Sequence, residues 1–129
     1  MKREFERKAQ ADPRFLDLQF PAFITVANPT VIPADLSDNA DLDPGAIAAI
    51  ALALERGIAD VLIDESYGHA AALAHGLHVS GLLGVLIEGK QRCLIPQLTP
   101  LLDRLATGAR FWMHPRLREH VLRLAGEAP

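Results

Sequence analysis

The chain has 129 residues, half of them hydrophobic, which is enough for one domain with a core of its own. Charges, glycines and prolines interrupt the apolar runs, so no membrane span is expected, and the charged start lacks the apolar stretch of a signal peptide. The single cysteine excludes an internal disulfide and fits the cytoplasm, while a net charge of −3 gives no electrostatic indication of nucleic-acid binding.

The first forty residues give only local signals. Residues 1–11 mix both signs of charge and predict a solvated helix, and residues 22–27 are rich in β-branched and apolar side chains, which predicts a strand. Residues 30–39 lack any periodicity and predict an irregular connector. Four acidic residues make this region negative, but the spacing of a calcium-binding loop is absent, so a solvated loop is favoured; they are Asp35, Asp38, Asp41 and Asp43.

The stretch from Leu42 to Pro96 organises the chain, and it begins with a predicted helix. Asp43 and Pro44 suit the start of a helix, and Gly57 suits its left-handed end. Apolar residues between them recur at helical spacing and predict one buried face; they are Ile47, Ile50, Ala51 and Leu54. Residues 61–63 predict a buried parallel strand. Asp64 and Glu65 follow it, at the carboxyl end of a strand, where open α/β sheets bind their ligands.

The alternation of helix and strand then continues. Residues 67–75 predict a helix ending at Gly76, residues 77–80 a strand, and residues 81–89 a further helix. Short connections between such elements imply right-handed crossovers and a mostly parallel sheet, so the sequence predicts an α/β fold.

The last part of the chain predicts two helices around an extended segment. Residues 99–106 form the first, with Leu101, Leu102 and Leu105 buried, and Pro115 begins the second. In the second, we expect Leu117, Val121 and Leu124 inside and Arg116, Arg118 and Arg123 outside. Trp112, in the extended segment 111–113, is interpreted as a core residue, with base stacking as the alternative. Cys93 is expected to be at least half-buried and inert.

Other catalytic patterns find little support. The spacing of His69, His75 and His78 does not complete a zinc site. The sequence also lacks the G-x-S-x-G motif of serine hydrolases and the lysine of a phosphate-binding loop.

Several stretches together resemble one family. They are D-P-G-A-x-A-A-I-A-L-A from Asp43, V-L-I-D-E from Val61, V-S-G-L-L-G-V-L from Val79 and K-x-x-x-L-I-P from Lys90. They resemble the PIN-domain nucleases, and most closely a branch related to toxin–antitoxin ribonucleases. The resemblance implies a single domain over residues 1–129, with a three-layer α/β/α fold and a short, mostly parallel sheet.

The resemblance also implies a metal site. In the family, converging carboxylates hold Mg²⁺ or Mn²⁺, and the metal activates water against a phosphodiester. The positions that carry over are Glu4, Asp64 and Glu65 as metal ligands, with Glu4 and Asp64 as the catalytic pair. Two family positions lack their acid: Ala46 stands where the family has glutamate, and no aspartate-bearing first strand is found ahead of Glu4. The sequence therefore predicts a domain that is N-terminally truncated and lacks its first strand.

Two functions follow as hypotheses. The first is a degenerate ribonuclease of the toxin–antitoxin type, acting on RNA with a divalent metal. The alternative is a catalytically inactive PIN remnant that dimerises or binds an antitoxin-like protein. An unfilled position in the sheet would expose strand edges, so a homodimer or larger assembly is expected.

Overall fold

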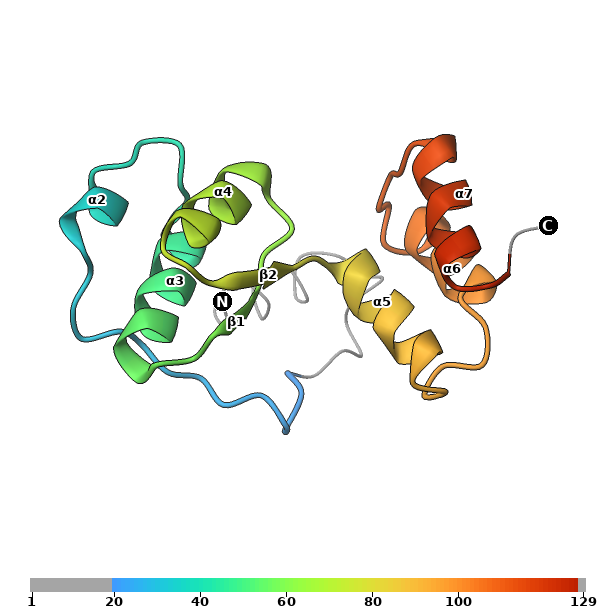
Figure 1. Ribbon diagram of the computed structural model, residues 1–129, viewed down its shortest axis with the longest axis horizontal. Coiled ribbons are helices and arrows are strands. Elements are labelled where there is room, and N and C mark those ends of the chain that lie inside the picture. The colour runs from blue at the N-terminus through green and yellow to red at the C-terminus, as the bar shows by residue number, and fades with distance from the viewer. Residues whose placement is uncertain (1–19, 128–129) are drawn as a thin grey trace. The chain divides into compact units, whose positions relative to one another are not determined.

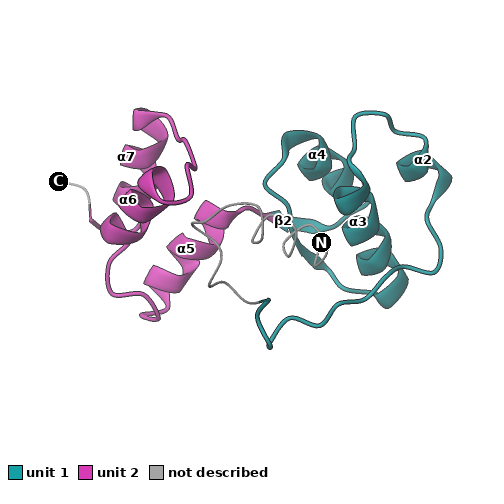
Figure 2. Cartoon of the chain, turned by 180° about the vertical axis from the view of Figure 1, so that it is seen from behind, with its two compact units in different colours: residues 1–79 teal, residues 80–129 magenta. Residues whose placement is uncertain are grey.

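The computed structural model describes residues 20–127, which form six helices and two short strands (Figure 1). The chain divides into two compact units, residues 1–79 and 80–129 (Figure 2). The helix predicted over residues 1–11, which contains Glu4, lies outside the described residues. Among the helices that the structure describes, none has the length and apolar character needed to cross a membrane.

Unit 1 contains the predicted alternation of helix and strand. Its elements are α2 (Ala34–Ser37), α3 (Pro44–Arg56), β1 (Asp60–Leu62), α4 (Ser66–Ala74) and β2 (His78–Ser80). The two strands pair in one sheet, and α4 connects them as a crossover, so they run parallel. The α/β fold class with a short parallel sheet is thereby confirmed.

Helix α3 forms as its sequence predicts. The Asp43 carboxylate accepts a hydrogen bond from the Ala46 N–H at 2.7 Å, and Pro44 occupies the first turn. Gly57 ends the helix with a φ of 66°, a left-handed conformation that glycine adopts without steric cost. Ile50 and Ala51 are fully buried in the core of unit 1, and Ile47 and Leu54 pack against that core.

The N-terminal part of unit 1 differs from two predictions. Residues 22–27 are not a strand: the Ile24 N–H donates to the Pro21 carbonyl at 3.2 Å in a turn, and the Phe23 side chain is 88% exposed. β-Branched side chains favour a strand only where a neighbouring strand is available, and the described sheet has two strands, β1 and β2. The predicted irregular connector also contains α2, whose Leu36 is buried in the core.

Strand β1 is not buried on both faces as predicted. Ile63, directly after the strand, is buried and Val61 is half-buried, but Leu62 between them is 68% exposed. Alternate side chains of a strand point to opposite faces of the sheet. One face therefore meets the helices of unit 1, while the side chain of Leu62 remains open to solvent.

Unit 2 is a three-helix unit made of α5 (Leu82–Gln91), α6 (Thr99–Thr107) and α7 (Pro115–Leu124). Its core is formed by Leu98, Leu102, Val121 and Ala125. Leu102 is fully buried and Leu101 and Leu105 pack against the core, which confirms the predicted stripe of α6.

The buried stripe of α7 is rotated by one residue from the prediction. Val121, Leu122 and Ala125 face the core, whereas Leu117 and Leu124 are 43% and 50% exposed. Arg118, expected outside, is half-buried because its guanidinium binds the Asp103 carboxylate on α6 at 2.7 Å. The ion pair joins α7 to α6.

Two further predictions for unit 2 are wrong. Cys93 is exposed, because α5 ends at Gln91 and the chain reverses through Cys93 with a φ of 61°. The reversal places Ile95 against Gly89 and leaves Cys93 outside. Trp112 is 77% exposed and is not a core residue, since the neighbouring Met113 packs against the core of unit 2 instead.

Candidate functional site

The predicted acidic pair lies where β1 meets α4. Asp64 and Glu65 come one residue after the end of the strand, behind Ile63, and both are exposed. Glu65 is the residue that precedes the first turn of α4, and its side chain bends toward the helix. The carboxyl end of β1 and the N-terminal turn of α4 therefore meet at these two residues.

Glu65 caps helix α4. One carboxylate oxygen accepts the Tyr67 N–H at 2.7 Å, and the other accepts the Gly68 N–H at 2.7 Å. These N–H groups belong to the first turn, where a helix offers no partners of its own, and a carboxylate there also interacts favourably with the helix dipole. Glu65 is one of the metal ligands that the family resemblance implies, and both of its carboxylate oxygens are held by backbone N–H groups of α4.

Gly68 brings the first turns of α3 and α4 close together. A Cβ atom at Gly68 would lie 2.8 Å from Ile63 Cγ2, 3.1 Å from Glu65 Oε2 and 3.3 Å from the Cβ of Ala46. Ala46, in the first turn of α3, is buried at this junction. The position where the resemblance leads one to expect glutamate is therefore filled by a methyl group that packs beside Gly68.

The described residues do not by themselves provide a metal site. Within residues 20–127, no three histidine, cysteine, aspartate or glutamate side chains gather in a way that could hold a metal ion. Glu4, the third predicted ligand, lies outside the described residues. Two carboxylates, one of them capping a helix, fall short of the set of oxygen ligands that Mg²⁺ or Mn²⁺ requires.

Two of the three histidines weighed for a zinc site, His75 and His78, each pair with a single acid, and the two pairs are separate. His75, the residue after the last turn of α4, contacts the Asp35 carboxylate of α2 at 2.6 Å. His78 on β2 lies 3.4 Å from Asp60 on β1. Each pair links two neighbouring elements of unit 1.

Sequence reasoning missed Glu127, whose carboxyl group has the most perturbed pKa within residues 20–127. Its carboxylate accepts the Leu98 N–H at 2.6 Å, the Thr99 N–H at 3.1 Å and the Thr99 hydroxyl at 3.0 Å, and Lys90 Nζ lies 3.4 Å away. Burial raises the pKa of Glu127, but these hydrogen bonds and the lysine outweigh it and lower the pKa to about 2. One signal in the sequence could have indicated this role: Leu98, the residue before α6, has no side chain that can cap the helix, so α6 needs an acceptor from elsewhere.

Glu55 plays a similar part in unit 1. Its carboxylate accepts hydrogen bonds from the Thr30 N–H at 2.8 Å and the Val31 N–H at 3.2 Å, and from the Thr30 hydroxyl. The hydrogen bonds from Thr30 lead in lowering the pKa of Glu55 below its ordinary value. Glu55 therefore ties the segment before α2 to the last turn of α3.

Comparison with known proteins identifies the family. A family model described as a PIN domain matches residues 2–127, which include nearly all of both units. No curated protein and no solved structure matches the chain. The family match agrees with the α/β fold of unit 1. The chain therefore belongs to the PIN-domain family.

Proposed function

We propose that the chain is a degenerate PIN-domain protein of the toxin–antitoxin ribonuclease type, with negligible RNA cleavage in its present sequence. The proposal is supported by family membership and by the packing at Ala46. The methyl group of Ala46 packs at Gly68, whose first-turn N–H binds the Glu65 carboxylate, and the family resemblance leads one to expect a glutamate at position 46. A methyl group cannot bind a metal ion, and Glu4 and Asp64 remain the acids proposed for catalysis.

Both units are proposed to form one PIN domain. The family match runs without a break from residue 2 to residue 127, across the boundary at residue 80. In this proposal Mg²⁺ or Mn²⁺ is the family's cofactor, and binding in this chain is weak because an acid is missing at Ala46.

The test is a cleavage assay of the full chain with single-stranded RNA. We expect no Mn²⁺- or Mg²⁺-dependent cleavage above the rate with EDTA. Ala46→Glu alone is expected to restore little, because metal ligands act as a unit and their effects do not add. Whatever activity appears should be lost in Asp64→Asn, which keeps the shape of the side chain and removes its charge.

Robust wild-type cleavage that depends on Mn²⁺ and disappears in Asp64→Asn would contradict the loss of activity while supporting the ribonuclease class. Cleavage that survives both EDTA and Asp64→Asn would show that the acidic pair is not the site.

A second candidate function is binding of a partner without catalysis. It is supported by large apolar side chains that unit 1 leaves open: Leu62 on β1, Tyr67 and Leu73 on α4 are 68%, 57% and 55% exposed. The partner would be a second copy of the chain or an antitoxin-like protein. Pull-down from the native host cannot decide between them, but the self-association measured below can.

A further inference from the structure

The net charge of the whole chain hides an uneven distribution. Residues 1–79 contain six lysines and arginines against twelve acids, a net charge of −6, whereas residues 80–129 contain seven against four, a net charge of +3. Electrostatic attraction of a polyanion depends on the local charge of a surface and not on the total of the chain. The net positive charge of unit 2 is therefore of the sign that attracts the phosphates of a nucleic acid.

Three of the four acidic residues of unit 2 form ion pairs within the unit. Three acids bind bases: Glu88 pairs with Arg92 at 2.6 Å, Asp103 with Arg118 at 2.7 Å, and Glu127 with Lys90 at 3.4 Å. Within residues 80–127, four exposed arginines have no carboxylate partner; they are Arg104, Arg110, Arg116 and Arg123. The positive excess of unit 2 is thus available at its surface.

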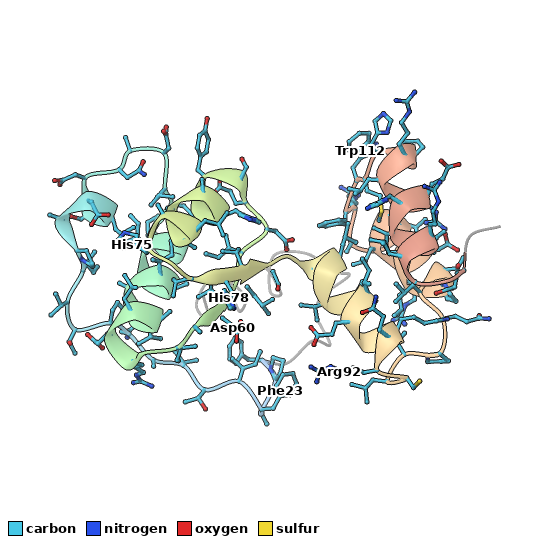
Figure 3. All side chains as sticks on the ribbon, in the orientation of Figure 1. Phe23, Asp60, His75, His78, Arg92 and Trp112 are labelled. Atoms are coloured by element: carbon cyan, nitrogen blue, oxygen red, sulfur yellow. The ribbon has the colours of Figure 1, made fainter. Side chains whose placement is uncertain are left out.

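An exposed tryptophan, Trp112, lies between Arg110 and Arg116 in the sequence. Phe111 and Met113 are half-buried, and the Phe111 N–H donates to the Leu105 carbonyl at 2.8 Å, so the alternate residues Trp112 and His114 point outward. Trp112, at the N-terminal end of α7 in Figure 3, is 77% exposed. Its ring meets the His114 ring edge to face, with centroids 6.1 Å apart at 89°. The contact restrains the indole and leaves most of it open.

We propose that the exposed residues Arg110, Trp112, His114 and Arg116, here called the Trp112 surface, bind single-stranded RNA. This rests on the proposed function for the choice of RNA as the polyanion. A base would stack on the indole of Trp112, and the two arginines would contact backbone phosphates. Stacking on an exposed aromatic ring tolerates any base, because every base has a π face. The residues that flank Trp112 on the outside are basic, so charge complementarity favours a polyanion over an apolar protein surface.

The test uses the full chain, in EDTA, with a uridylate oligomer of about ten nucleotides, within the range that one single-strand binding domain covers. An abasic ribose-phosphate oligomer of the same length is the matched control ligand. Trp112 is the only tryptophan in the chain, so its fluorescence reports on this surface alone. We expect the uridylate oligomer to quench the fluorescence and to bind about ten-fold more tightly than the abasic oligomer.

Three variants and a matched control separate stacking from charge. Trp112→Ala should weaken uridylate binding by about ten-fold and leave abasic binding unchanged, while Trp112→Phe should retain most of the affinity. Arg116→Gln should reduce the slope of log K against log salt by about 0.7, the value for one single-strand phosphate. Arg56→Gln removes the same charge from unit 1, at an exposed site, and should change affinity by less than about two-fold. Circular dichroism checks that each variant is folded.

Three results would overturn the proposal. They are binding without quenching of Trp112, equal weakening of both ligands by Trp112→Ala, and absence of uridylate binding at low salt. Stronger quenching by an acidic polypeptide than by uridylate would assign the surface to a protein partner and also overturn it. Because binding is measured in EDTA, a failure of the cleavage experiment leaves this result unaffected.

Discussion

The carboxylate of Glu65 satisfies two of the backbone N–H groups that α4 leaves without helical partners in its first turn. Small residues are required at both Ala46 and Gly68, where the first turns of α3 and α4 meet, since a Cβ atom at Gly68 would lie 3.3 Å from the Cβ of Ala46. A glutamate at position 46 would bring a second negative charge toward Glu65 in a partly buried place. Without a cation between them, two carboxylates so placed repel each other.

Glu65→Ala should lower the free energy of unfolding by about 1 kcal/mol, because the first turn of α4 loses its cap. Glu65→Asp should keep most of the stability, since aspartate is a favoured capping residue. The measurement is urea unfolding followed by circular dichroism in EDTA. A residue that served only as a metal ligand would give no difference between wild type and Glu65→Ala without metal, and that outcome would contradict the capping role.

At the scale of an element, α6 depends on a residue far away in the sequence. Leu98, which precedes the helix, has no side chain that can cap, and Glu127 supplies the acceptor from beyond the end of α7. The same carboxylate lies 3.4 Å from Lys90 on α5. One side chain therefore joins all three helices of unit 2.

Acid should weaken unit 2 through Glu127. The pKa of this carboxyl falls from 4.5 to about 2 on folding, so its stabilising contribution is complete above pH 4.5 and is lost as the pH falls toward 2. The contribution is on the order of 1–2 kcal/mol, because solvent screening reduces the full value of the shift. Glu127→Gln should be less stable than wild type at about pH 7 and nearly equal to it at about pH 2. Urea midpoints at both pH values measure this, and a constant difference between the two chains would contradict it.

Local signals predicted the elements better than they predicted the packing between them. Asp43, Pro44 and Gly57 mark α3 because a cap and a left-handed turn depend only on neighbouring residues. The buried face of α7 depends instead on how this helix packs into the core of unit 2. The Arg118–Asp103 ion pair, which joins α7 to α6, likewise gives no sign in the sequence of either helix. Glu65 is a second example. Its position after β1 was predictable from the sequence, but the hydrogen bonds of its carboxylate to the backbone of α4 were not.

At the scale of the whole molecule, the described sheet consists of two short strands. Within residues 20–127, each of these strands has one neighbour and leaves its other edge without a strand beside it. Leu62, the last residue of β1, is 68% exposed. Two-stranded sheets are marginal unless further strands or helices cover them, and exposed apolar edges recruit other chains.

We therefore expect the chain to form a homodimer or a larger assembly at micromolar concentration, through the part of unit 1 around β1. Leu62→Lys should shift the chain toward the monomer, because a lysine on an edge strand opposes pairing with another strand and its exposed position spares the core. Leu94→Lys is the matched control, since Leu94 is 76% exposed in the turn after α5, in unit 2. Sedimentation equilibrium measures the three chains side by side. A wild type that sediments as a monomer would contradict the assembly, and equal dissociation by both lysine variants would show that β1 is not the contact.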